Sequence, residues 1–213
     1  MRYVKKFKNI IFLYRTFSNS AINRIMFTAP RNPCSRVLLD PHEILYKSWA
    51  VRRTKGLGQV RNGSWDLAPN IIAVDDYWKY NGLIQRYKFG FHWRDTDYFA
   101  EYFDRGWSEE KINERCVRCD NLFNSMRGLG YVKNPGGEVL ITINRSGDIG
   151  IYDRWHRMTM ARCLNIPVYA QVLVRHHEWQ KFRDKISKVP SKISDDLRRH
   201  PDLLDLFKPV ICK

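Results

Sequence analysis

The 213-residue sequence predicts an α+β protein in which a small mixed sheet is flanked by helices. Two observations predict this class. Hydrophobic residues make up 44% of the chain, which is enough for a sizeable core and too many for wholesale disorder. The apolar pattern also changes along the chain: short strand-like runs come first, helical spacing follows over about 75–127, and strands alternate with helices after residue 138.

The first elements are short. Val37-Leu-Leu39 has the pattern of a buried strand, and Ile44-Leu-Tyr46 fits either a second strand or a helical turn. Glycines and a proline between residues 56 and 69 predict a loop region. Apolar residues then recur at three- and four-residue spacings, which is the pattern of amphipathic helices. We interpret these helices as an insertion over residues 75–131.

Strands return after the insertion. The runs 139–143 and 149–152 flank an Asn-Arg-Ser-Gly-Asp turn and predict a β-hairpin. A helix from about 155 to 164, a strand over 167–174 and a helix over about 176–186 complete a domain that we place at 37–188. Residues 189–213 contain three prolines and fit a basic, loosely helical tail.

The charge of the chain is strongly positive. Its 37 Lys and Arg residues against 22 Asp and Glu give a net charge of +15, which attracts nucleic acid, nucleotides or anionic lipid. Residues 1–36 form a basic N-terminal arm with eight basic and no acidic residues. Four interpretations of this arm remain open: contact with nucleic-acid phosphates, an organelle transit peptide, a solvated extension packed on the domain, or a membrane surface anchor. The anchor would use apolar residues of the arm, namely Ile10, Ile11, Phe12, Leu13 and Phe17.

The cysteines indicate a reducing compartment. They are five in number and scattered, which argues against a disulfide framework. No apolar run approaches the roughly 18 residues of a membrane-spanning helix. We therefore expect a soluble, cytoplasmic protein. Cys116 and Cys119 form a lone C-x-x-C on the apolar face of a helix, without the second pair that a zinc site requires. Core packing is the better interpretation, and we expect neither zinc nor another protein-held metal.

The most informative stretch is 151–162, where a strand leads directly into a helix. The opening of that helix contains Arg154, His156 and Arg157. Free backbone N–H groups and the positive end of the helix dipole already favour an anion there. Three potential cations at the same end would repel one another without an anion between them, although Asp153 is placed to cap the helix and offset part of that repulsion. We predict a phosphate site formed by Asp153, Arg154, His156 and Arg157.

The same stretch resembles the signature of the ParB/sulfiredoxin-like superfamily. The resemblance rests on Asp153-Arg-Trp-His-Arg157, on Ala161 and on Ile166-Pro-Val168, with weaker support from Leu39-Asp-Pro41. It implies a small sheet flanked by helices, in which the start of the signature helix holds nucleotide phosphates or lies near DNA. Members include CTP-dependent DNA clamps, sulfiredoxins, free-serine kinases and nucleases. By position, His156 and Arg157 would contact phosphate and Asp153 would orient the turn.

Three departures from the family pattern narrow these expectations. Trp155 stands where sulfiredoxins carry their reactive cysteine, so sulfinic-acid repair is excluded. Arg154 stands where the family commonly has glycine, so its side chain either crowds the site or adds a phosphate ligand. The 25 residues after 188 are too few for the helix-turn-helix domain of segregation proteins, and we expect no role in plasmid partition.

The sequence thus predicts a ParB-like protein that binds nucleotide phosphates and associates with nucleic acid through a basic surface. The expected ligand is a nucleoside triphosphate with Mg²⁺. An alternative is a phosphotransferase or nuclease on the same fold, with Asp40, Glu43 or Asp66 as catalytic base or magnesium ligand, although no spacing fixes any of them. Another is a non-enzymatic interaction module whose basic arm binds a membrane or a partner. Whether the protein is an enzyme stays open.

Overall fold

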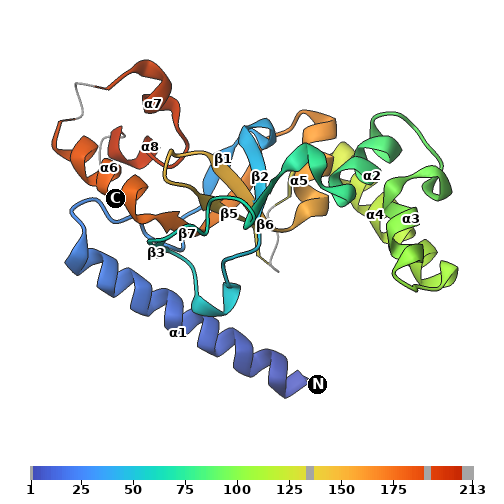
Figure 1. The fold of residues 1–213 in the computed structure, drawn as a ribbon, viewed down its shortest axis with the longest axis horizontal. Helices are drawn as coiled ribbons and strands as arrows, with labels where there is room; N and C mark the ends of the chain where they lie inside the picture. Colours follow the sequence, from blue (N-terminus) through green and yellow to red (C-terminus); the bar gives the residue numbers. More distant parts are fainter. Residues whose placement is uncertain (1, 133–136, 190–192, 208–213) are drawn as a thin grey trace.

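A seven-stranded mixed sheet organises the chain, and helices flank it (Figure 1). The computed structural model describes residues 2–132, 137–189 and 193–207. It confirms the predicted α+β class with a mixed sheet flanked by helices. None of the helices in these described ranges is both long enough and apolar enough to cross a membrane.

The strand order is β1-β7-β5-β6-β2-β4, and β3 pairs with β7. The predicted hairpin is confirmed as the antiparallel pair β5 and β6, while β7 runs parallel to β5. The strands are β1 (Val37–Leu39), β2 (Ile44–Ser48), β3 (Gln59–Arg61), β4 (Ile71–Ala73), β5 (Val139–Ile143), β6 (Ile149–Asp153) and β7 (Val168–His176).

Two strands lie where the sequence analysis predicted either a strand or a helical turn, at 44–46, and a loop region, at 56–69. The run at 44–46 is part of a strand, because β2 pairs in parallel with β6 and antiparallel with β4. The expected loop region contains β3, whose backbone pairs in parallel with the end of β7. Both β2 and β3 therefore exist through partners that lie far away in the sequence.

The helices are α1 (Arg2–Met26), α2 (Trp78–Tyr87), α3 (Asp97–Asp104), α4 (Glu109–Leu129), α5 (Trp155–Leu164), α6 (His177–Lys188), α7 (Asp195–Arg199) and α8 (Leu204–Phe207), with 3₁₀ turns at Pro41–Glu43, Arg53–Lys55, Val74–Asp76 and Trp93–Asp95. Helices α2 to α4 confirm the predicted helical stretch. Ser108 caps α4, as the sequence predicts, by accepting a hydrogen bond from the Lys111 N–H.

Helix α5 lies between the sheet and the helical insertion. It packs on β5 on one side and on α2 and α4 on the other. Met158 and Met160 of α5 are completely buried, and Leu83 and Tyr98 of the insertion are also completely buried. Helices α2 to α4 and α5 therefore share one hydrophobic core, which fixes α4 beside the start of α5.

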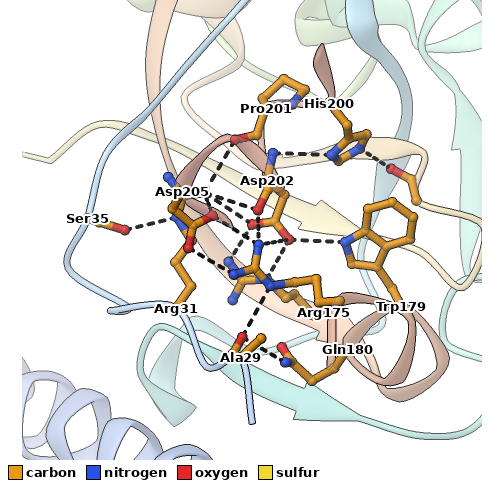
Figure 2. A network of polar contacts seen from close by, with 12 residues as sticks. Ala29, Arg31, Ser35, Arg175, Trp179, Gln180, His200, Pro201, Asp202 and Asp205 are labelled. Atoms are coloured by element: carbon orange, nitrogen blue, oxygen red, sulfur yellow. Dashed lines mark hydrogen bonds and ion pairs between the residues drawn. The ribbon is translucent and has the colours of Figure 1, made fainter. Parts of the chain in front are cut away.

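The C-terminal segment is joined to the body by a buried ionic network (Figure 2). Asp202 accepts hydrogen bonds from Arg175 at 2.6 and 2.8 Å and from the Trp179 indole at 3.0 Å. Burial opposes ionisation of Asp202, but Arg175 and Arg183 hold its pKa well below the usual range. Residues 200–205, expected in the tail, thus pack on β7 and α6. Arg31, from the expected arm, joins the same network through Asp205 at 3.1 Å.

Candidate anion-binding site

The predicted helix start exists, and the chain reaches it through a strained residue. Strand β6 ends at Asp153 and α5 begins at Trp155, so Arg154 alone makes the turn. Its φ of 74° and ψ of 36° lie in the left-handed region. This conformation suits glycine and costs an L-residue about 1–2 kcal/mol. The position where the resembling family has glycine is thus one that requires a positive φ, and this chain keeps an arginine there.

Asp153 does not cap α5, contrary to one of our expectations. Its Oδ1 accepts a hydrogen bond of 2.7 Å from the Arg154 N–H, and its Oδ2 pairs with Arg53 at 3.4 Å. These contacts hold the turn between β6 and α5. Among the residues that the structure describes, no side chain caps α5, and the first turn of the helix contains no carboxylate. The positive end of the helix dipole is therefore left without a negative side chain from the first turn.

A cavity of about 240 Å³ opens between this helix start and α4. It brings together three of the predicted residues, Arg154, His156 and Arg157. Helix α4 supplies the remaining lining, namely Arg115, Arg118, Cys119 and Leu122. Four arginines thus surround one small cavity, and no carboxylate is among its lining residues in the described chain.

Sequence reasoning missed the contribution of α4, although a signal was present. Positions 115, 118, 119 and 122 follow the i, i+3, i+4, i+7 spacing, which places all four side chains on one face of a helix. The apolar residues of α4 revealed the helix, and no role was assigned to the arginines on the same face. The missing information was which element faces them, and only the packing of α4 against α5 supplies it.

His156 is a neutral member of the site. Burial, followed by the nearby charges of Arg115 and Lys79, lowers the pKa of His156 to about 4. Of the three potential cations at the helix start, the two arginines therefore carry charge at neutral pH and the imidazole does not.

A short relay of hydrogen bonds connects Arg115 to His156 through Tyr98. The Arg115 Nε donates a hydrogen bond of 2.6 Å to the Tyr98 hydroxyl oxygen. The Tyr98 hydroxyl lies 2.8 Å from Nε2 of His156 and 3.8 Å from Sγ of Cys119. Tyr98 thus joins a cation on α4 to the neutral imidazole at the start of α5.

Two of the cavity arginines, Arg157 and Arg118, have no carboxylate as a hydrogen-bond acceptor among the described residues. Arg157 donates a 3.2 Å hydrogen bond to the Val132 carbonyl and lies 5.7 Å from the centre of the Tyr131 ring. Within the described ranges no carboxylate pairs with it. Arg118 is exposed and makes neither a hydrogen bond nor an ion pair with any described residue. Their charges are available to a ligand.

Positive charge extends from the cavity towards α2. Burial and the neighbouring Arg115, Lys47 and Arg105 lower the pKa of Lys79 to about 8. The Lys79 ammonium lies 4.8 Å from the centre of the Trp78 ring, which is within the range of a cation–π contact. Burial is the larger cause of this shift, and the three neighbouring cations add to it.

The three carboxylates considered for catalysis lie elsewhere, and none lines the cavity. Asp40 caps the turn Pro41–Glu43 through the His42 N–H at 2.8 Å. Glu43 borders a different cavity, and burial raises its pKa. Asp66 is buried and bound to Arg145 at 2.7, 2.9 and 3.0 Å. Burial opposes its ionisation, but these hydrogen bonds lower its pKa.

The C-x-x-C pair contributes packing. Cys116 and Cys119 are both buried in the core that α4 shares with α5. Burial raises the pKa of both thiols, that of Cys116 to about 12, so neither is a thiolate at neutral pH. In the part of the chain that the structure describes, no group of three or more His, Cys, Asp or Glu side chains is placed to hold a metal ion.

The assembled site is an arginine-rich cavity at a helix start that no described side chain caps, with one neutral histidine held by Tyr98. Its electrostatics favour a small, multiply charged anion. Comparison with protein-family models, with curated proteins and with solved structures found no match for this chain.

Proposed function

We propose that this chain is a ParB-like protein that binds nucleotide phosphate groups between α4 and the start of α5, and that associates with nucleic acid through its basic surface. One observation carries the proposal. Four arginines and an uncapped helix N-terminus converge on a cavity that no carboxylate lines in the described chain. Such a concentration of like charge is stabilised by a bound anion.

Phosphate is the anion that these groups suit best. Guanidinium groups bind phosphate oxygens through paired N–H donors, and helix N-termini add backbone N–H groups. A cavity of about 240 Å³ is smaller than the roughly 300–1,000 Å³ typical of sites that enclose a whole drug-sized ligand. We therefore assign it to the phosphoryl part of a nucleoside triphosphate, with sugar and base outside. Magnesium would arrive with the phosphates, whose oxygens would hold it.

Binding is favoured over catalysis by the placement of the acids. Phosphoryl transfer needs a base or a magnesium-holding carboxylate near the phosphate. Asp40, Glu43 and Asp66 lie outside the cavity, and Asp66 already has its oxygens bound to Arg145. The phosphotransferase and nuclease alternatives therefore gain no support from the described lining, whereas the arginines support a binding role directly.

Thermal unfolding in the presence of anions tests the proposal. The panel contains chloride and sulfate as reference anions, and inorganic phosphate, pyrophosphate and nucleoside di- and triphosphates, with and without Mg²⁺, at constant ionic strength. A ligand at 100 times its dissociation constant stabilises the fold by about 2.7 kcal/mol. We expect pyrophosphate and triphosphates to raise the melting temperature more than chloride or sulfate does.

A matched pair of variants tests whether the anion-dependent rise in melting temperature comes from this cavity. Arg118→Ala removes a cavity arginine that forms neither a hydrogen bond nor an ion pair with the described residues, so the ligand-free melting temperature should change little while the anion-dependent rise shrinks. Arg127→Ala, an exposed arginine on the same helix outside the cavity, should keep the full rise. Equal rises in both variants, or no rise in the wild type with any phosphate compound, would refute the proposed site.

A further inference from the structure

Helix α1 docks on the body through its polar side. Thr16 and Asn23 are buried. The Thr16 hydroxyl accepts a 3.0 Å hydrogen bond from the Leu57 N–H, and the Asn23 amide donates one of 2.7 Å to the Gly58 carbonyl. The Asn19 amide adds a 2.9 Å bond to the Leu57 carbonyl. A row of polar side chains thus holds the helix against the backbone of the 54–58 segment.

The apolar side of α1 faces away from the body. We call this surface the α1 stripe; it consists of Ile10, Leu13, Tyr14, Phe17, Ala21 and Ile25. Its large members are 51–85% exposed, and Ile25 is the most exposed of them. With about 100° between successive residues of an α-helix, the stripe is centred about 150° from the docked side. Helices of globular proteins usually show the opposite arrangement, with the apolar side inward.

The charge of α1 indicates which kind of partner binds the stripe. Residues 2–26 contain six Lys and Arg residues and no Asp or Glu. A second copy of this chain would bring the same positive helix against the first, within a molecule whose net charge is +15. An anionic lipid surface offers both an apolar layer for the stripe and negative headgroups for the basic residues.

We propose that α1 binds the surface of an anionic bilayer, with its stripe in the boundary between headgroups and acyl chains. The helix lies at the periphery of the molecule, where the body does not cover its outer side (Figure 1). Because the docked side points away from the stripe, the body stays in water when the stripe is inserted. Phe17 and Ala21 of the stripe and the neighbouring Arg24 border one cavity of about 340 Å³, so a basic side chain adjoins the stripe.

Vesicle binding by the full-length protein tests this proposal. Co-sedimentation is measured with vesicles of phosphatidylcholine alone and of phosphatidylcholine mixed with phosphatidylglycerol. The stripe variant is Leu13→Ser with Phe17→Ser, which are 51% and 64% exposed. The matched control is Ile22→Ser with Met26→Ser, which are 55% and 67% exposed and lie on the other flank of the helix. Circular dichroism of each variant checks that α1 is retained.

We expect the wild type to bind the anionic vesicles, to bind the neutral ones far less, and to dissociate as salt rises. The stripe variant should bind at least about tenfold more weakly, since each side chain withdrawn from the lipid removes a contribution of that order. The control variant should bind nearly as well as wild type. Equal losses in both variants, absence of wild-type binding, or a wild-type dimer that only the stripe variant abolishes would overturn the proposal. Pyrophosphate binding between α4 and α5 is measured separately, so the two proposals can fail independently of each other.

Discussion

The left-handed turn at Arg154 allows the strain of the site to be separated from its binding role. Two substitutions are compared, Arg154→Gly and Arg154→Ala. Both remove the guanidinium from the cavity. The alanine variant keeps a side chain at a φ of 74°, whereas glycine adopts that conformation without a steric penalty. The two variants therefore differ in backbone strain and share the same loss of charge.

The expected magnitudes follow from this difference. The left-handed conformation costs a non-glycine residue about 1–2 kcal/mol, and glycine loses about 0.5–1 kcal/mol more than alanine through the entropy of the unfolded chain. The free energy of unfolding of Arg154→Gly should therefore exceed that of Arg154→Ala by about 1 kcal/mol, or about 2–4 °C in melting temperature. Each variant should bind pyrophosphate about 10- to 150-fold more weakly than wild type, as expected for a lost charge-assisted contact of about 1.5–3 kcal/mol.

Urea unfolding without ligand measures the first quantity, and titration calorimetry with pyrophosphate measures the second. Arg127→Ala serves as the control for a general loss of positive charge. Equal stabilities of the glycine and alanine variants would refute the strain at this turn. Wild-type affinity in both variants would show that the Arg154 side chain does not contact the anion.

Three further predictions concern the relay, the histidine and the buried network. Tyr98→Phe should destabilise the protein by about 1–3 kcal/mol in urea unfolding, because Arg115 and His156 lose their shared hydrogen-bond partner. The folded state holds His156 at a pKa of about 4, below the ordinary value of 6.5. At pH values between these two, the unfolded state therefore binds more protons than the folded state. Stability should therefore fall as pH drops from about 6.5 to 4, and the slope, followed by thermal unfolding across pH, should be shallower in His156→Gln. Asp202→Asn should cost about 3–5 kcal/mol, since it leaves the buried Arg175 without its carboxylate and Arg183 with Asp205 alone, and a loss below 1 kcal/mol in urea unfolding would contradict the network.

Local pattern was sufficient to predict the elements that carry the site. The hairpin of β5 and β6, helix α5 and helix α4 all follow from periodicity and turn residues within a few positions of one another. The predicted start of α5 at Trp155 agrees with the structure. The convergence of Arg154, His156 and Arg157 on one cavity also follows from that local prediction.

Partners distant in sequence account for what the sequence did not predict. The backbone of β3 pairs with a strand more than 100 residues away in the sequence, and β3 itself has no apolar run that would predict a strand. The relay to His156 needs Tyr98 and Arg115 from the insertion, which reach α5 only after the helices have packed. The segment around Asp202 has the composition of a tail, and its role depends on Arg175 and Arg183 from β7 and α6.

Tungstate, a heavy phosphate analogue, offers the most direct test of an anion site between α4 and α5. Crystals of the wild-type protein are soaked in it, and the anomalous difference map locates the metal atom. We predict the strongest peak within hydrogen-bonding reach of Arg118 and Arg157, at the start of α5. A strongest peak on another surface, with none between these two arginines, would contradict the proposed function.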